Sequence, residues 1–148
     1  MPKTYTNLLT HLIFATKERL PRIDDEIKPR LHAYLGGIVR EIGGTAIIVG
    51  GVKDHVHLLV SLPPTLALSD VLRTVKTNSS RWMHEQNRKD FQWQTGFGAF
   101  SVSSGNVEKV RNYIAKQESH HRITSFREEF IDFLERSNMD FDEKFLWT

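Results

Sequence analysis

The chain has 148 residues, of which 39% are apolar and 26% charged, as in ordinary globular proteins. It contains no cysteine, which excludes disulfides, cysteine-held zinc, iron–sulfur clusters and thiol nucleophiles, so any metal must be held by histidine and oxygen ligands. Its apolar runs, such as residues 58–60, fall far short of the roughly 20 residues that cross a bilayer, and we expect a cytoplasmic protein with no membrane partner.

Charge is divided unevenly along the chain. Residues 1–123 hold 17 basic and 11 acidic side chains, whereas residues 124–148 hold three basic and seven acidic ones. A basic body with an acidic tail fits a polyanionic partner such as nucleic acid, although many solvated surfaces have the same composition.

Apolar periodicity and turn residues divide the chain into alternating strands and helices. In chain order we predict a strand at 6–16, a helix from 24–26 to 42, strands at 45–49 and 55–62, a helix at 69–86, a strand at 92–103, a helix at 106–121 and a short helix from 125. Apolar residues of both parities in the first strand predict burial on both faces. Gly36-Gly37 predicts either close packing of the first helix or a bend in it. Ser125 and Glu128 have the spacing of a capping box.

The order β-α-β-β-α-β followed by helices is that of a ferredoxin-like α+β sandwich with an antiparallel sheet. In that topology the first and third strands are central and both crossover helices cover one face, which leaves the other face for a site or for the third helix. We treat residues 1–148 as a single domain, with a core at about 4–103, a helix that carries Tyr113 at about 106–121 and an acidic tail at 124–148.

Two histidines share one face of the third strand. Alternation puts Val56 and Leu58 toward the core and His55 and His57 together on the opposite face. Imidazoles about 6.5–7 Å apart along a strand can converge on one ion. The alternative is that two of the seven histidines fall at this spacing by chance.

The helix at 106–121 carries a tyrosine and an amide four residues apart. Tyr113 and Gln117 lie on one face, with His120 and His121 near the same line. Read in isolation, this pair can be a surface hydrogen bond. Alternatively, Tyr113 is a nucleophile and the oxygen of Gln117 completes a metal face made of two histidines and one oxygen.

Taken together, these residues resemble a known family. The chain is similar to the single-tyrosine HUH transposases (His, bulky apolar residue, His) of the insertion-sequence-200 type, including relatives associated with repetitive extragenic palindromes. His55-Val56-His57 matches the paired histidines, and Tyr113 and Gln117 match the tyrosine and the amide ligand of the family's Tyr-x-x-x-Gln arrangement. Further similarity lies in the segments His11–Lys17, Phe100–Ser103 and Phe141–Trp147.

The resemblance implies a prokaryotic DNA transposase, associated with the nucleoid when bound to DNA, that acts on single-stranded DNA folded into hairpins. Tyr113 would attack a phosphodiester, form a 5′-phosphotyrosine and leave a free 3′-hydroxyl that permits strand transfer without ATP. His55, His57 and Gln117 would hold a divalent ion. Imidazoles and an amide oxygen suit Mn²⁺ better than Mg²⁺ by softness, but Mg²⁺ is the abundant ion and either can serve.

Seven basic residues in or beside the helices predicted at 69–86 and 106–121 are candidate contacts for DNA phosphates, although such a residue is more often only a solvated surface charge. They are Arg73, Lys76, Arg81, Lys109, Arg111, Lys116 and Arg122. Because excision and rejoining need two cleavages and the chain has one suitable tyrosine, we expect a C₂ homodimer. The break at 103–106 would let the tyrosine helix exchange between protomers, as in several family members, but the sequence leaves same-chain and partner-chain sites open.

Two other functions fit the same residues. A catalytically silent protein that binds DNA hairpins would tolerate the loss of Tyr113. A metal-dependent phosphodiesterase that uses water would require the histidines but would form no covalent adduct with DNA.

Overall fold

The computed structural model describes residues 3–146, so Trp147, the last residue of the similar segments, lies outside the described residues. The strands are β1 (Leu8–Ala15), β2 (Thr45–Gly51), β3 (His55–Leu62) and β4 (Gly98–Ser101). The helices are α1 (Lys28–Glu41), α2 (Leu68–Glu85), α3 (Val107–Ala115), α4 (Gln117–His120) and α5 (Phe126–Arg136). Short 3₁₀ turns lie at Lys17–Arg19, Ser104–Asn106 and Glu143–Phe145. Within the described part of the chain, no helix combines the length and the apolar character that crossing a membrane requires.

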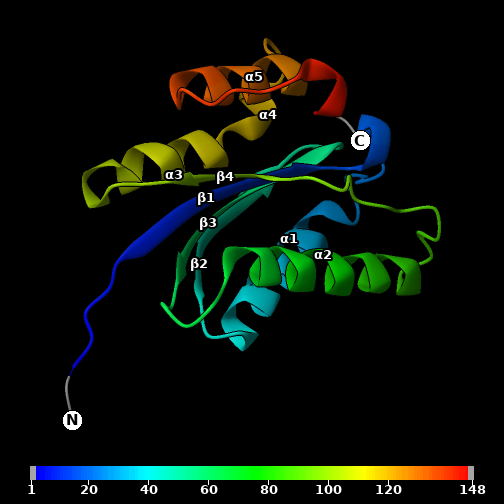
Figure 1. Ribbon diagram of the computed structural model, residues 1–148. Coiled ribbons are helices and arrows are strands. Elements are labelled where there is room, and N and C mark those ends of the chain that lie inside the picture. The colour runs from blue at the N-terminus through cyan, green and yellow to red at the C-terminus, as the bar shows by residue number, and fades with distance from the viewer. Residues whose placement is uncertain (1–2, 147–148) are drawn as a thin grey trace.

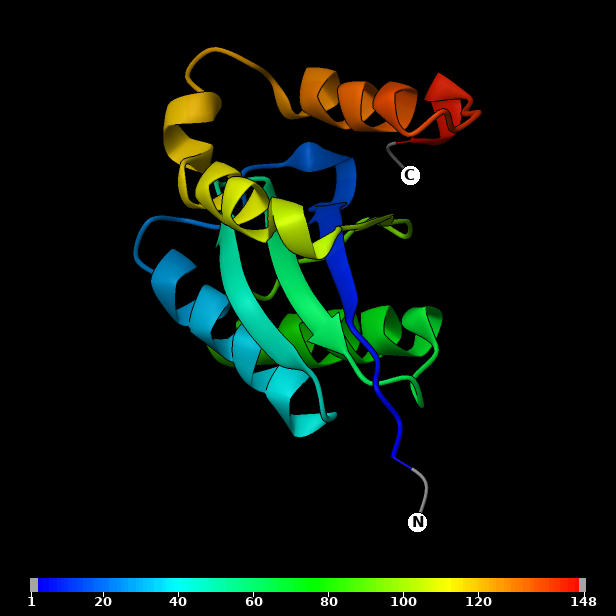
Figure 2. The same ribbon diagram turned by 90° about the vertical axis from the view of Figure 1, so that its left-hand side faces the viewer.

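The strands form one antiparallel sheet in the order β2-β3-β1-β4. The first and third strands are therefore central, as predicted. Helices α1 and α2 cover one face of this sheet, and α3, α4 and α5 lie over the other (Figure 1; turned by 90° in Figure 2). The ferredoxin-like α+β sandwich is confirmed, and the additional helices make a third layer on the face that the first two helices leave open.

The main core lies between the sheet and the layer of α1 and α2. Val56, Leu58 and Val60 of β3 are fully buried there with Leu12 and Phe14 of β1, which confirms the predicted alternation. Of the two glycines of α1, Gly36 faces the sheet. A Cβ atom on Gly36 would lie 3.6 Å from the Cβ atom of Ala46 on β2, so the helix approaches the sheet closely at this point.

A second apolar cluster joins α5 to the opposite face of the sheet. Phe126, Phe130 and Leu134 of α5 pack against Ile13 and Ala15 of β1. The predicted cap of this helix is present, since the hydroxyl oxygen of Ser125 accepts a hydrogen bond from the backbone N–H of Glu128 at 3.2 Å. The acidic C-terminal region is therefore built into the third layer through an aromatic helix face.

Two predicted elements are shorter than expected. The fourth strand was predicted at 92–103, but only Gly98–Ser101 pairs with β1 as a strand. Before it, backbone hydrogen bonds pair residues 92–94 with Ala15 and Lys17 around an isolated bridge between Thr16 and Trp93. The backbone N–H of Ala15 donates instead to the side-chain oxygen of Gln94 at 2.6 Å, which separates this bridge from β4. The helix predicted at 106–121 is divided into α3 and α4 at Lys116, whose φ of −103° and ψ of 23° are not helical.

Candidate active site

Strand β3 presents His55 and His57 on the sheet face beneath α3, α4 and α5. In the register of the sheet, His57 lies opposite Ile13 and His55 opposite Ala15. Both imidazoles are fully buried, and their ring centroids are 5.1 Å apart. The alternation of β3 therefore holds two imidazoles side by side in a space closed to solvent.

A second residue orients each of these imidazoles. The Nδ1 atom of His55 lies 2.7 Å from the Oδ1 atom of Asp54, and the Nδ1 atom of His57 shares a 2.8 Å hydrogen bond with the Nε2 atom of His11. Both Nε2 atoms therefore point away from these partners and toward the third layer. Such outer partners fix the ring orientation of histidines that bind metals.

Neither Asp54 nor His11 is a predicted site residue. The sequence features that point to these two residues are weak. Asp54 directly precedes His55 in the sequence, and His11 has the same strand parity as Ile13 and Ala15.

Helix α3 brings Tyr113 to the histidines of its own chain. The helix packs on β2 at a glycine, since a Cβ atom on Gly50 would lie only 2.5 Å from the carbonyl oxygen of Ile114. The ring of Tyr113, the preceding residue, lies 5.8 Å from the ring of His57 between centroids. The Tyr113 hydroxyl donates a hydrogen bond to Glu129 and lies 3.3 Å from the Nε2 atom of His120.

The break at Lys116 turns Gln117 toward the histidines. Gln117 begins α4 and is 1% exposed. Its side-chain oxygen lies 3.1 Å from the Nε2 atom of His55, and its amide nitrogen donates to the carboxylate of Glu129 at 3.3 Å. The structure thus brings Tyr113, His55, His57 and Gln117 together, and helices α3 and α4 meet at the point where the predicted continuous helix is interrupted.

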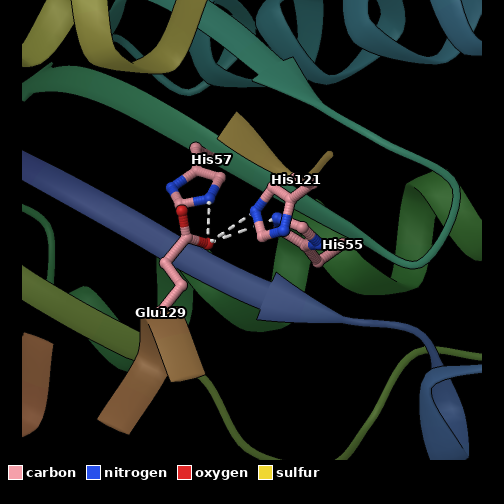
Figure 3. A group of neighbouring side chains, drawn as sticks. All are labelled: His55, His57, His121 and Glu129. Carbon is pink, nitrogen blue, oxygen red and sulfur yellow. Dashed lines mark hydrogen bonds and ion pairs between the residues drawn. The ribbon is translucent and has the colours of Figure 1, made fainter. Parts of the chain in front are cut away.

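Glu129 of α5 stands at the centre of this group and was missed by the sequence analysis. Its Oε1 atom lies 3.0 Å from the Nε2 atom of His57, 3.2 Å from that of His121 and 3.4 Å from that of His55 (Figure 3). A sequence signal existed, because positions 126, 129, 130 and 133 form one helical stripe and 129 is its only charged member.

Burial and hydrogen bonds shift the protonation of these groups. Burial lowers the pKa of His57 to about 4. Burial also opposes protonation of His55, but hydrogen bonds and charge from Asp54 and Glu129 outweigh it and raise its pKa to about 9. Burial and the neighbouring carboxylate of Glu129 raise the pKa of Tyr113 above its usual range, so the tyrosine rests as a protonated phenol.

The same balance acts on Glu129. Burial alone would raise its pKa, but hydrogen bonds from His121, His55 and His57 hold that pKa well below the usual range of a carboxyl group. The carboxylate is therefore negatively charged among the imidazoles.

The candidate DNA contacts fall on two sides of the sheet. Arg73, Lys76 and Arg81 belong to α2, in the layer opposite the histidines (Figure 1). The ammonium group of Lys76 donates to the carbonyl oxygens of Gln94 at 2.8 Å and Gly96 at 2.6 Å, and burial lowers its pKa to about 8. On the histidine side, in α3 and α4 or beside them, the exposed candidates are Lys109, Arg111, Lys116 and Arg122.

A cavity of about 600 Å³ lies between α3 and α5 and reaches Tyr113 and Glu129. Its wall holds Lys109 and Arg136 together with Glu128 and Asp132, and Arg136 pairs with Asp132 at 3.0 Å, so the charges in the cavity are mixed. The arrangement therefore combines a hydroxyl nucleophile with nitrogen and oxygen atoms suited to a divalent cation.

Comparisons with known proteins identify the family of the chain. Residues 4–117 match a family described as transposase, IS200-like. The ISDra2 transposase TnpA of Deinococcus radiodurans is 28% identical over 114 residues, which are 72% of this chain and 81% of that protein. The transposase of insertion sequence IS200 from Salmonella typhimurium is 25% identical over 122 residues, which are 77% of this chain and 79% of that protein.

Two solved structures share the fold. A crystal structure of a transposase from Deinococcus radiodurans R1 superimposes with a TM-score of 0.63 at 26% identity, covering 79% of this chain and 98% of that one. A structure of the REP-associated tyrosine transposase bound to a REP hairpin gives a TM-score of 0.61 at 15% identity, covering 82% of this chain and 73% of that one. Helix α5 lies beyond the residues that match the family.

Proposed function

This chain belongs to the IS200-like transposase family, and from that premise we propose that it cleaves and rejoins single-stranded DNA through a covalent bond to Tyr113. The observation that carries the proposal is the meeting of Tyr113 with His55, His57 and Gln117 at one buried point, reached from β3, α3 and α4. A surface tyrosine–amide pair would not enclose two oriented imidazoles.

In this reaction the oxygen of Tyr113 bonds to phosphorus while the bond from phosphorus to the 3′-oxygen breaks. The phenol loses its proton and the departing 3′-oxygen gains one, which leaves a 5′-phosphotyrosine and a 3′-hydroxyl. Because one phosphoester replaces another, the reverse step can join a new 3′-hydroxyl without ATP. The burial that keeps the phenol protonated at rest also means that Tyr113 attacks only when the developing negative charge is stabilised.

We assign that stabilisation to a divalent ion, Mg²⁺ or Mn²⁺, held by His55, His57 and Gln117. The donor atoms fit such an ion. Asp54 and His11 occupy the far nitrogens of the two imidazoles, and the Gln117 oxygen faces the Nε2 atom of His55 at 3.1 Å. When bound, the ion acts as a Lewis acid for the phosphate and the phenolate.

We propose hairpin-containing single-stranded DNA as the substrate. One protein of the same fold has been solved with a REP hairpin, and Lys109 stands in the wall of the cavity beside Tyr113. Of the predicted phosphate contacts, Lys109, Arg111, Lys116 and Arg122 are near enough to the histidine face to serve the cleaved strand, while Arg73, Lys76 and Arg81 suit a part of the DNA that wraps to the other layer.

A homodimer remains part of the proposal. Each chain can hold one covalent DNA end, so two protomers must act together to cut and rejoin two ends. Exchange of α3 would preserve the contact between Gly50 and Ile114 across two chains and would change only the connection at Ser104–Asn106, where Gly105 has open space around it.

Denaturing gels with 3′-labelled single strands, copied from palindromic repeats beside the gene, test the proposal. The protein should form a slow, protease-sensitive band that disappears with Tyr113→Phe, with the double variant His55→Ala/His57→Ala, or in EDTA. Cleavage without that band would indicate a phosphodiesterase that uses water, and binding without cleavage would indicate a silent hairpin-binding protein.

Mixing the two inactive variants tests exchange of the tyrosine helix. If helices are exchanged, a mixed dimer contains one complete site, and single-end cleavage returns. If each chain uses its own tyrosine, cleavage stays absent once subunit exchange has been verified independently. A protein that stays monomeric with DNA bound, by light scattering, would contradict the dimer.

A further inference from the structure

The carboxylate of Glu129 lies at the centre of the histidine group, although it is neither the proposed nucleophile nor one of the proposed metal ligands. The residue is 3% exposed and sits among Phe126, Phe130 and Leu134 on the buried face of α5. A charged carboxylate placed in such surroundings costs several kcal/mol unless partners compensate for its lost hydration. The partners that compensate for its lost hydration are imidazole rings. A buried carboxylate with such partners is unexpected in the third layer.

Distances to these imidazoles are those between ligands of one ion. The Oε1 atom lies 3.0, 3.2 and 3.4 Å from the Nε2 atoms of His57, His121 and His55. Ligands bonded at about 2.1 Å lie about 3.0 Å apart along an octahedral edge and about 3.4 Å apart along a tetrahedral edge. His55, His57, His121 and Glu129 together place four donor atoms within 4.8 Å of one another.

The orientation of His55 adds an independent argument. Its Nδ1 atom is committed to the carboxylate of Asp54 at 2.7 Å. Its Nε2 atom faces the oxygen of Gln117 at 3.1 Å and the Oε1 atom of Glu129 at 3.4 Å, so a proton on Nε2 serves these two oxygens when no ion is bound. A cation that displaces this proton would have one nitrogen and two oxygen atoms already directed at it.

Charge also favours a carboxylate at this position. The imidazoles and the Gln117 amide contribute no negative charge to a bound dication, whereas Glu129 contributes one. Carboxylates suit Mg²⁺ and Mn²⁺ better than imidazoles do, so adding Glu129 converts a set of soft ligands into one that fits the hard ions expected for phosphoryl transfer.

The second oxygen of the same carboxylate faces the nucleophile. It accepts a hydrogen bond from the hydroxyl of Tyr113 and lies 3.2 Å from the Nε2 atom of His120. One side chain thus spans the histidine group and the reacting oxygen.

We infer that Glu129 is a metal ligand of this site, supplied by α5 from outside the family-matched residues 4–117, and that its other oxygen holds the Tyr113 hydroxyl beside the ion. The inference deepens the proposed function and rests on it, because it adds a ligand to the same metal. His121, which follows α4, is the third histidine of the four residues whose donor atoms lie within 4.8 Å of one another.

Calorimetry with Mn²⁺ alone, without DNA, tests the assignment. Glu129→Gln keeps the shape of the side chain but removes its charge, and should weaken Mn²⁺ binding at least tenfold. Glu129→Asp keeps an anionic oxygen and should lose less affinity than the Gln variant. Glu135→Gln, an exposed glutamate of the same helix, should bind Mn²⁺ like the natural protein.

The outcomes separate this inference from the proposed function. If the natural protein binds no Mn²⁺, or if His55→Ala/His57→Ala binds it normally, the metal site itself is wrong. If the histidine variant loses Mn²⁺ but Glu129→Gln binds it equally well, only the role of Glu129 is overturned. Tighter binding by Glu129→Gln also overturns it, because the carboxylate would then compete with the ion. Should the Gln variant fail to fold by circular dichroism, the Asp variant takes its place. It should still bind Mn²⁺ more weakly than the natural protein, because its carboxylate is one methylene shorter, and unchanged affinity would overturn the role of Glu129.

Discussion

Placing one methyl group on Gly50 should separate the tyrosine from the histidines without touching either. A Cβ atom there would lie 2.5 Å from the carbonyl oxygen of Ile114 and 2.7 Å from its Cγ2 atom. Because the closest contact is with backbone, a rotamer change cannot relieve it. Restoring an ordinary separation of 3.4 Å requires α3 to move by about 0.9 Å away from β2.

Tyr113 precedes Ile114 and would move with it. A displacement of about 1 Å at a reacting group can reduce a rate by about 10²-fold, while overpacking costs about 1–3 kcal/mol of stability. We therefore expect Gly50→Ala to fold, to unfold at a lower urea concentration and to form the covalent DNA adduct about 100-fold more slowly on denaturing gels.

Gly37→Ala is the matched control. Its Cβ atom would meet only the side chain of Arg40 at 3.8 Å, and alanine stabilises a helix interior by about 0.5–1 kcal/mol relative to glycine. This variant should keep the full rate of adduct formation. An undiminished rate in Gly50→Ala, with Tyr113 still required, would refute the idea that the close approach of α3 to β2 sets the position of the nucleophile.

Three further predictions concern the surroundings of the site. Asp54→Ala removes the partner of the Nδ1 atom of His55 and should weaken Mn²⁺ binding about 10- to 100-fold by calorimetry, whereas unchanged affinity would show that the carboxylate does not orient the ring. Ser125→Ala removes the cap of α5 and should lower the free energy of unfolding by about 1 kcal/mol in urea, and no loss would mean that the cap is not formed in solution. Burial lowers the pKa of the His32 imidazole from 6.5 to about 4. Its neutral form therefore contributes fully to the free energy of unfolding above pH 6.5, and this contribution is lost as the pH falls from 6.5 to 4. In His32→Gln the free energy of unfolding should fall by up to about 3 kcal/mol less over this pH range than in the natural protein, and parallel pH profiles of the two proteins would contradict the prediction.

The sheet and its histidine face could be predicted because alternation and strand order act together. Once β1 and β3 are central, the apolar residues Val56 and Leu58 must face α1 and α2, and His55 and His57 can only lie on the other face. The depth of their burial could not be predicted, since it depends on the third layer. That layer is held by long-range packing of α5 on Ile13 and Ala15, which no local pattern in β3 reveals.

The interruption between α3 and α4 escaped prediction for a different reason. Neither glycine nor proline occurs between Tyr113 and His121, so the local sequence favours one continuous helix. The contacts of Gln117 with His55 and with Glu129 are tertiary, and they accompany the break at Lys116. The fourth strand was overextended in the same way, because the side chain of Gln94 replaces a backbone partner only in the folded protein.

Glu129 shows how composition can conceal a site. Seven acidic residues in 124–148 suggest a solvated tail, yet one of them occupies the apolar stripe of an amphipathic helix. Its carboxylate is buried against imidazoles, so docking of α5 and occupation of the histidine group by a cation should stabilise one another. Such coupling is reciprocal, because the factor by which docking of α5 raises the affinity for the ion equals the factor by which the ion stabilises that docking. The aromatic face of α5, which packs through Phe126 and Phe130 and brings Phe133 to 5.9 Å from the ring of Tyr113 between centroids, is thus part of the energetics of the site.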